Sequence, residues 1–567
     1  MKKPVDHMLG SAMLSPTSPV PAGSYGTWTI TYTVGPLGID SGGQILVAIR
    51  IVSDWGEPQF SDPEAEGYSS VTIQSAGDAK IRASWQPRAH VRPKNTSVVL
   101  DVYDGSLDPG DTVTLVLGDT GGGSPGLRAQ TYIESHFEFF VLVDPTNSCD
   151  PRPIADRLTL PVVAAEVANL VCILPSQAKV GEPVPIFVKG EDMWRNPVPI
   201  TDGIKLNWTG FGFGTVVDAE KMTITSREMD IGHFEVSAAG LTCRSNTIEI
   251  DDNLPTYKRY WGDLHGQTGT TVGIGSDDEY FSFGRDWAKL DFTSHQGNDF
   301  QISDEYWKEL NQTFAKYHDD GNFVVFPGYE WSASSPTGGD HNIFYRKEGM
   351  PILRSSHWLV PEVPATELSP AHPADVFYDK LKQAIPADDV IVAQHVGGRY
   401  ANLRKYFDQE LISLVELVSD WGVFEWMLWD AFDKGYIVGV MANSDGHHGR
   451  PGAEGAGMTH FGIKNGLTCA LATDRTRDAI FDAHKNRRCY ATTGERMLLT
   501  FSLNGGQMGS VLPWEEEFEL LTSVVGTGPL ESLQLDRGKE IIAEIRPDAF
   551  KALTQSNHVR VSWRGSR

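Results

Sequence analysis

Two regions of the chain share one pattern of hydrophobic and polar positions. In residues 24 to about 145, and again from about 155 to 252, hydrophobic residues alternate with polar ones in short segments separated by Gly, Pro, Asp and Asn. Segments such as WTITYTV and HFEFFVLVD have the period of two that is typical of strands with one buried face. No helical period intervenes over a useful length. The pattern predicts two all-β domains, a sandwich over 1–150 and an immunoglobulin-like domain over 151–255.

After residue 255 the pattern changes to an alternation of strand-like and helix-like segments. KLDFTSHQG is followed by SDEYWKELNQTFAKYHDD, and ADVFYDKLKQA precedes DVIVAQHVGG. Such alternation predicts a mostly parallel sheet or barrel with helices outside it. We therefore expect a β/α barrel over 256–500. Short strand-like segments after about residue 497 predict a small C-terminal β appendage over 501–567.

Length and charge limit the class of protein. A chain of 567 residues is too long for a single core. Its net charge of −26 argues against nucleic acid or an anionic membrane as a partner. No apolar run has the length of a membrane span, and the N-terminal segment has no apolar signal region. We expect a small-molecule substrate, and the sequence leaves a homo-oligomer open.

The cysteines favour a reducing compartment. There are five, and they form no C-x-x-C pair, so neither a zinc ribbon nor a disulfide scaffold is predicted. Free, mostly buried thiols are the favoured interpretation, which with the missing signal region predicts a cytoplasmic protein. A bridge between Cys172 and Cys243 is left open, because both fall in one predicted β domain.

Polar residues gather at the ends of the strands predicted in the middle region. They are His265, His295, Glu330, His341, His395, Asp445 and His447. In β/α barrels the carboxyl ends of the strands form the face that carries the chemistry. Imidazoles and carboxylates converging there would be costly to bury without a cation, and together they are the ligands of zinc, manganese and iron. Seven candidates are too many for one ion, so two ions with a bridging carboxylate fit better.

The order of these motifs resembles a known superfamily. The run GDLHGQT, TSHQGND, PGYEW, AQH and NSDGH, over residues 258 to 510, resembles the polymerase and histidinol phosphatase (PHP) superfamily. It is similar in particular to a bacterial branch of uncertain function that includes carbaryl-type carbamate hydrolases. The resemblance implies a distorted (β/α)7 barrel, as the third part of a multidomain chain, that holds two or three metal ions.

Carried over residue by residue, the resemblance implies a ligand set. His265, Glu330 and Asp445 would hold one ion, and Glu330 would bridge to a second ion held by His341 and His395. His295 and His447 match the ligands of the family's third metal site.

The sequence also departs from the family pattern. Gln267 stands at the ligand position where the family has the second histidine of its first motif, and Ser294 precedes His295 where the family has Asp. A neutral amide is a poor ligand for a transition metal. We therefore expect fewer than three ions, in a binuclear site for zinc or manganese, with iron as a third option. Asn298 and Asp299 could supply substitute ligands.

Several residues near the motifs have two interpretations. Arg399 and Arg450 are either surface cations or a clamp for a substrate anion or a developing oxyanion. His448 is the candidate acid for the leaving group. Glu416 lies inside a predicted strand, either as a partner of a metal-bound histidine or as an ordinary core carboxylate. The tryptophans of the segment WGVFEWMLW, among them Trp426, are expected in the core.

These features predict a metal-dependent hydrolase in which a metal-bound hydroxide and Glu330 act on a small-molecule ester, amide or carbamate bond. Two alternatives remain. One is a phosphoesterase of the PHP type, which the superfamily at large suggests. The other is a non-catalytic binding protein with a degenerate barrel, which the two β domains would suit.

Overall fold

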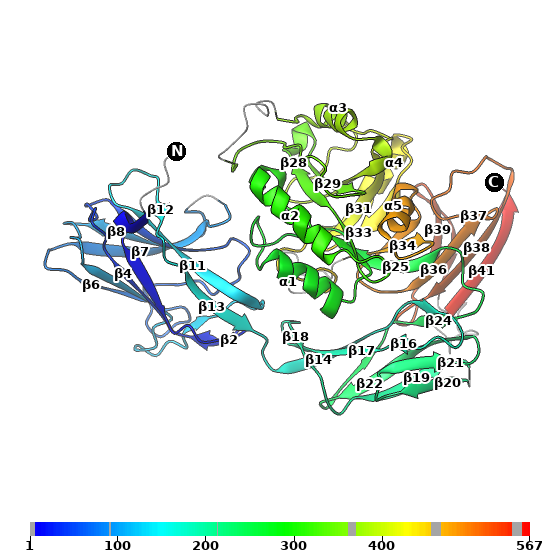
Figure 1. Ribbon diagram of the computed structural model, residues 1–567, viewed down its shortest axis with the longest axis horizontal. Coiled ribbons are helices and arrows are strands. Elements are labelled where there is room, and N and C mark those ends of the chain that lie inside the picture. The colour runs from blue at the N-terminus through cyan, green and yellow to red at the C-terminus, as the bar shows by residue number, and fades with distance from the viewer. Residues whose placement is uncertain are drawn as a thin grey trace. The chain divides into compact units, whose positions relative to one another are not determined.

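The computed structural model describes residues 6–89, 92–212, 214–360, 370–454, 466–546 and 558–566. Over these residues the chain is mostly β-structure with five α-helices (Figure 1). It divides into two compact units, of which unit 1 comprises the chain up to Val167 with Glu191–Val198 and Val272–Gly275. Unit 2 comprises Ala168–Gly190, Pro199–Thr271 and the chain from Ser276 onward. The four domains expected from the sequence stay a prediction.

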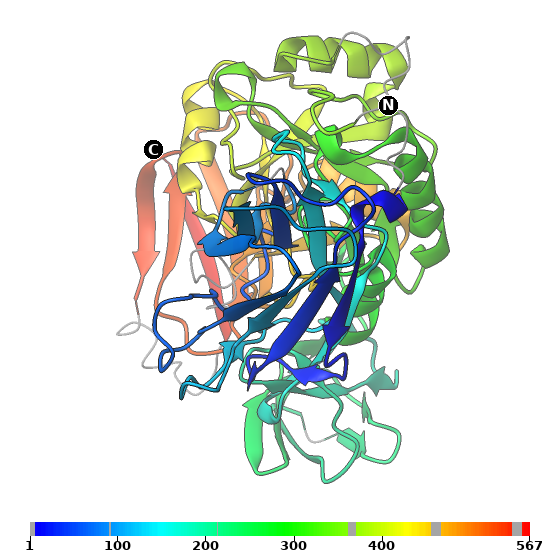
Figure 2. The same ribbon diagram turned by 90° about the vertical axis from the view of Figure 1, so that its left-hand side faces the viewer.

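Unit 1 is a β domain, as the alternating pattern predicts; Figure 2 gives a second view of its strands, coloured blue to cyan. One sheet has the order β1-β4-β9-β6, and a larger one runs β2-β13-β11-β5-β8-β7. In β4 every second residue from Trp28 is buried. The core includes Trp55, which stacks on Phe137 with ring centroids 4.4 Å apart. The strands are β1 (Ser11–Ser15), β2 (Val20–Pro21), β3 (Tyr25–Gly26), β4 (Trp28–Thr33), β5 (Gln44–Ile49), β6 (Ser70–Gln74), β7 (Lys80–Gln86), β8 (Thr96–Tyr103), β9 (Thr112–Leu117), β10 (Leu127–Arg128), β11 (Glu134–Asp144), β12 (Arg152–Pro153) and β13 (Leu158–Val163).

The chain that follows also forms short strands. Its longest pairing is antiparallel, between β19 and β22, with Lys205 opposite Ser237 and Gly210 opposite Gly232. The immunoglobulin-like character of this region stays a prediction. The strands are β14 (Val167–Ile173), β15 (Gln177–Ala178), β16 (Val184–Pro185), β17 (Phe187–Asp192), β18 (Pro197–Val198), β19 (Lys205–Gly210), β20 (Thr215–Asp218), β21 (Thr223–Ser226), β22 (Asp230–Ala238), β23 (Leu241–Arg244) and β24 (Ile248–Ile250).

Two sheets form the central part of unit 2. The first has the order β27-β26-β25-β34-β35, and the second β28-β29-β30-β31-β32 with β33 paired to β31. The first contains β25 (Lys258–Asp263), β26 (Phe292–Ser294), β27 (Val324–Phe326), β34 (Leu467–Ala472) and β35 (Cys489–Thr492). The second contains β28 (Gly328–Ser332), β29 (Asp340–Tyr345), β30 (Val390–Gln394), β31 (Ile412–Ser419), β32 (Gly422–Val423) and β33 (Gly439–Ala442).

The pairing in these sheets is mixed. Strands β25, β26 and β27 run parallel, as do β30, β31 and β33, but β29 is antiparallel to both of its neighbours. Isolated bridges, Gly266 to Gly446 and Asn298 to Glu330, connect residues of the two sheets. The continuous (β/α)7 barrel expected from the sequence is therefore not what the strands show. The pairing brings the ends of β25, β26 and β33 close to β28.

The helices follow from local sequence signals. Ser276 is the N-cap of helix α1 and forms a capping box, since its side chain accepts from the Glu279 amide and the Glu279 carboxylate accepts from the Ser276 amide. Helix α2 buries Leu310 and Phe314, four residues apart on one face. The helices are α1 (Asp277–Ser282), α2 (Asp304–Tyr317), α3 (Ala374–Ala384), α4 (Glu425–Asp433) and α5 (Arg477–Lys485).

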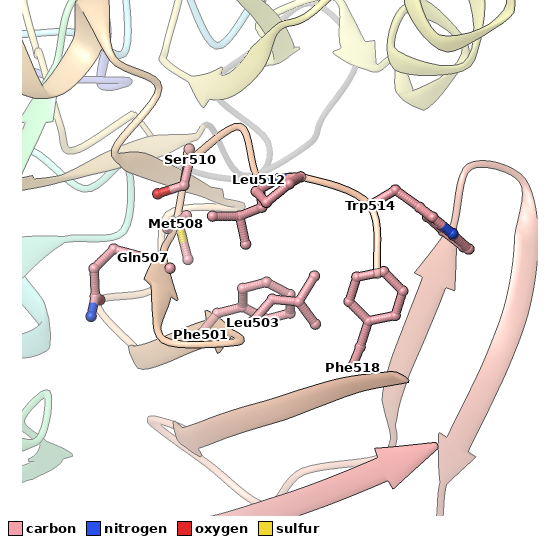
Figure 3. Close-up of a pocket in the computed structure, with 11 residues that line it drawn as sticks. Phe501, Leu503, Gln507, Met508, Ser510, Leu512, Trp514 and Phe518 are labelled. Carbon is pink, nitrogen blue, oxygen red and sulfur yellow. The ribbon is translucent and has the colours of Figure 1, made fainter. Parts of the chain in front are cut away.

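The last part of the described chain forms strands. An apolar pocket lies among them (Figure 3), and its volume is about 320 Å³. Phe501 and Phe518 line it, and Trp514 at its edge is 68% exposed. None of the histidines predicted as ligands lines this pocket. The strands are β36 (Leu498–Leu503), β37 (Gly506–Gln507), β38 (Glu517–Val525), β39 (Leu533–Arg537), β40 (Glu540–Ile545) and β41 (His558–Ser566).

Two further predictions concern the whole chain. In the part of the chain that the structure describes, none of the helices is both long and apolar enough to cross a membrane. All five cysteines are free thiols, including Cys172 and Cys243, and three of the five are buried.

Candidate metal centre

Four of the predicted ligands converge where the ends of the central strands meet. His265 follows β25, His395 follows β30 and Asp445 follows β33, whereas Glu330 lies within β28. The rings of the two histidines are perpendicular, at 80°, with centroids 4.5 Å apart. Residues 180 positions apart in the chain thus share one buried site.

Glu330 lies between the two imidazoles. Its Oε2 is 3.9 Å from Nε2 of His265, and its Oε1 is 3.7 Å from Nε2 of His395. Asp445 completes the group, with Oδ1 3.1 Å from the same Nε2 of His265. Asp445 has φ of 51°, a left-handed conformation that is uncommon outside glycine and concentrates at functional sites.

Several polar atoms of this group are buried without a hydrogen-bond partner among the described residues. They are Nε2 of His265, both ring nitrogens of His395 and Oδ2 of Asp445. Leaving such atoms unpaired costs free energy. Imidazole nitrogens and carboxylate oxygens aimed at one another are the donor set of a divalent transition metal, so these residues fit such an ion.

Glu416 fixes the orientation of His265. Its Oε1 lies 3.0 Å from Nδ1 of His265, and both side chains are fully buried. Asn342 and Asn443 donate to the other carboxylate oxygen, over 3.0 and 2.8 Å. With a proton on Nδ1, the lone pair of His265 is on Nε2, on the side of Glu330 and Asp445.

Side-chain donors hold Glu330 from the other side. Gln267 and Asn298 donate to Oε2 over 3.0 and 2.7 Å, and the Ser332 hydroxyl donates to Oε1 over 2.9 Å. The Gln267 carbonyl oxygen accepts from the Thr271 hydroxyl over 2.9 Å. Both ends of the Gln267 amide are thus used in hydrogen bonds, and Asn298 likewise acts as a donor.

Asp340 is a site residue that the sequence reasoning missed. Its carboxylate, the Glu330 carboxylate and the His395 imidazole offer three ligand atoms that lie within 4.8 Å of one another, and a second such group is His265, His395 and Glu416. The carboxylate also pairs with Arg399, whose Nε is 3.0 Å from Oδ1 and whose amide donates to Oδ2 over 3.0 Å. Arg399 therefore lies next to the cluster, as predicted.

His341, by contrast, is not brought to the cluster. Strand β29 pairs His341 with Trp331, whereas Asp340 pairs with Ser332 and Asn342 with Glu330. Successive side chains of a strand point to opposite faces, so His341 faces away from Glu330. Its Nε2 lies 2.7 Å from the Tyr378 hydroxyl, and burial lowers its pKa to about 3. The position expected for His341 in the second ion's ligand set is occupied instead by its neighbour Asp340.

His295 is satisfied by its own hydrogen bonds. Nδ1 accepts from the Gly297 amide over 3.3 Å, and Nε2 lies 3.1 Å from the Thr268 hydroxyl, which donates to Asp277 over 2.6 Å. Burial lowers the pKa of His295, which keeps the ring neutral. Asp299 accepts from the amides of Ser332 and Ser355. Neither residue offers a free ligand atom to the Glu330 group.

The loop after Asp445 carries three further predicted residues. His447, His448 and Arg450 are all buried, with Arg450 1% exposed. Nδ1 of His448 lies 3.3 Å from a carboxylate oxygen of Glu454, which is itself buried. A carboxylate in this position can hold the ring of His448 in one orientation.

Charges within the cluster shift one another's pKa values. Burial alone would lower the pKa of His265, but the carboxylates of Asp445 and Glu416 outweigh it and hold that pKa well above the ordinary value. Burial would raise the pKa of Glu330, but the nearby imidazoles of His265 and His395 hold it well below its usual range. For Asp445 burial dominates and the pKa is held high. The buried carboxylates and imidazoles of this site are thus strongly coupled to one another.

Comparisons with known proteins give distant relatives. Residues 442–508, which include Asp445, His447 and His448, match DUF3604, a family described as a protein of unknown function. A protein of Chlamydia trachomatis serovar D is 22% identical over 500 residues, covering 78% of this chain and 76% of its own. A Chlamydia pneumoniae protein is 22% identical over 502 residues with the same coverage, and both are described as uncharacterized.

Among the solved structures that are similar to the chain is that of a two-domain protein of Bacteroides vulgatus, described as containing a predicted PHP-like metal-dependent phosphoesterase. It is 12% identical, covers 55% of this chain and 87% of its own, and has a TM-score of 0.29. A similarity of this extent does not establish a shared fold.

Proposed function

We propose that the protein is a hydrolase that depends on a divalent transition metal, with its active site at Glu330. The observation that carries the proposal is the set of buried, partnerless donor atoms on His265, His395 and Asp445 around the Glu330 carboxylate. Several buried polar atoms without hydrogen-bond partners cost free energy when they gather at one point of a core. A bound ligand compensates for that cost.

Two ions would share this donor set. His265, Glu330 and Asp445 would hold one, and Glu330, His395 and Asp340 the other, with zinc or manganese as the metal and iron as an alternative. When bound, such ions polarise the scissile bond and lower the pKa of water.

The protein's own residues supply the remaining functions. Glu416 holds His265 in the tautomer that leaves Nε2 unprotonated, and Gln267 and Asn298 hold Glu330 in place by donating to it. Arg399 stabilises an anionic group of the substrate or the negative charge that develops on it. His448, oriented by Glu454, donates a proton to the leaving group, and Arg450 supports the same loop.

The bond we favour is an ester, amide or carbamate of a small molecule. The reason is the reduced ligand set: Gln267 stands where the first PHP motif has its second histidine, His295 stands at a position of the third site, and both side chains are occupied by hydrogen bonds. A phosphoester is the second candidate, and it shares every residue assigned above.

Metal analysis of the purified protein is the first test. We expect up to two equivalents of transition metal per chain, and loss of hydrolysis after chelation with recovery on adding Zn²⁺ or Mn²⁺. Glu330→Gln should lower both metal content and hydrolysis, whereas Glu348→Gln, which alters a carboxylate paired with Arg477 elsewhere, should leave both unchanged. Ethyl esters, naphthyl carbamates and nitrophenyl phosphate identify the bond. Absence of metal affinity would contradict the proposal and favour a non-catalytic binding protein.

A further inference from the structure

The segment after His395 forms a tight loop against the candidate metal centre. Val396 and Tyr400 form an isolated bridge across its base, and the Ala401 amide donates to the His395 carbonyl over 2.9 Å. The loop is closed further by the amide of Arg399, which donates to Asp340. Side chains that project from this loop are therefore held at a fixed place beside the site.

Arg399 is anchored at one end only. Its Nε pairs with Asp340, and its guanidinium carbon lies 5.5 Å from the centre of the Phe300 ring. The side chain is nonetheless 31% exposed. A guanidinium fixed at Nε can still present its terminal amino groups to a carboxylate or phosphate oxygen.

The residue that follows Arg399 in the chain is one of a pair of exposed aromatic side chains. Tyr400 is 54% exposed and Trp426 is 40% exposed, and their rings stand at 80° with centroids 6.3 Å apart. Helix α4 buries Met427 and Ala431, so Trp426 lies on the side of the helix away from the core. The prediction that Trp426 belongs to the core is therefore wrong.

We infer that Tyr400 and Trp426 form the subsite for a planar, aromatic group of the substrate, and that Arg399 binds an anionic group on the same molecule. This inference rests on the proposed function and narrows its substrate to aromatic esters, amides or carbamates that carry an acidic group. Two perpendicular rings match one aromatic ring in area and favour edge-to-face or offset contact. The loop that carries Tyr400 begins at His395, and the Ala401 amide holds it closed by donating to the His395 carbonyl.

Steady-state hydrolysis of two ethyl esters tests the subsite. Monoethyl terephthalate and monoethyl succinate share a free carboxylate and an ethanol leaving group, but only the first has a ring. Tyr400→Ala and Trp426→Ala should each raise KM for the terephthalate about tenfold, which corresponds to about 1.4 kcal/mol, and leave KM for the succinate and metal content unchanged. Trp514→Ala, a distant exposed tryptophan, is the matched control and should change neither. Equal effects on both esters would overturn the inference.

Direct binding separates this inference from the proposed function. In calorimetry with metal-loaded protein, 1-naphthoate should bind at least tenfold more tightly than acetate, and Tyr400→Ala, Trp426→Ala and Arg399→Met should each weaken it. Naphthoate binding without any hydrolysis would overturn the proposed function and support the subsite. Hydrolysis with naphthoate no tighter than acetate, or unaffected by the three substitutions, would overturn the subsite and leave the hydrolase intact.

Discussion

Nδ1 of His265 lies 3.0 Å from Oε1 of Glu416, and neither side chain reaches solvent. The carboxylate therefore sets which nitrogen of the imidazole is available to the site, although Glu416 lies in the middle of β31 and not at its end. A buried carboxylate placed in this way acts on the ligand and not on the substrate.

Glu416→Gln should consequently weaken metal binding roughly 10- to 100-fold while the protein stays folded, because the amide can keep one hydrogen bond but loses the charge that favours the Nδ1–H tautomer. Competition with a fluorescent chelator measures this affinity. Glu348→Gln is the control, since Glu348 pairs with Arg477. Unchanged affinity in Glu416→Gln would mean that His265 binds no ion.

The two faces of β29 give a second prediction. His395→Asn should lower the amount of metal retained per chain, because His395 lies against Glu330. His341→Asn should retain the metal, because His341 faces Trp331 and Tyr378, although its loss of packing will lower the unfolding temperature. Elemental analysis after dialysis distinguishes the two variants. Equal metal loss in both would return His341 to the ligand set.

Two adjacent glycines give a third prediction. A Cβ added at Gly397 would lie 2.7 Å from a carboxylate oxygen of Asp340 and 2.9 Å from the His395 ring, whereas one at Gly398 would meet nothing closer than Trp421 at 3.9 Å. Gly397→Ala should thus displace the site residues and lower kcat/KM by about 100-fold, the scale of a 1 Å misplacement. Gly398→Ala should stay within about twofold. Similar kinetics for both variants would show that the loop tolerates the shift.

Acid stability gives a fourth prediction, away from the site. His484 is fully buried against Phe292 and Phe326, and burial lowers its pKa to about 4 from the ordinary 6.5. Because the folded state resists protonation that the unfolded state accepts, the free energy of unfolding should fall as pH drops from about 6.5 to about 4. The loss should reach about 3 kcal/mol.

Urea unfolding at several pH values measures this loss. His484→Leu removes the titrating group and should show a weaker pH dependence over the same interval, at the cost of the hydrogen bond between Nδ1 and the Ile480 carbonyl. If the wild type and His484→Leu lose stability in parallel, other groups are responsible.

Local patterns predicted part of this structure well. The alternation in β4 depends on neighbouring residues only, and it is found in the structure. The direction of β29 depends on its partners β28 and β30, which no local period encodes. The strands do not show the expected (β/α)7 barrel, and β29 is where the pairing departs from a parallel arrangement.

The same strand explains the error in the candidate site. In the segment DHNIFY, histidine is the strongest metal ligand by residue type, so His341 attracted the assignment. The period of two places Asp340 and Asn342 on one face and His341 on the other. Because Glu330 pairs with Asn342, the alternation of side chains along β29 places Asp340 on the same face as Glu330. The register between β28 and β29 depends on contacts outside β29, so the sequence of β29 alone does not reveal it.

The span of the site has a consequence for synthesis of the protein. Ser444 and Asn443 hydrogen-bond to the chain around His265, across sequence separations of 179 to 181 residues. At translation rates of about 5–20 residues per second, roughly 10–40 s separate the appearance of the two ends. During that interval His265 lacks Asp445, its carboxylate partner from the far end of the site. The proposed metal site would therefore be complete only after the chain has closed, so that an ion supplied after synthesis would meet the full set of ligands.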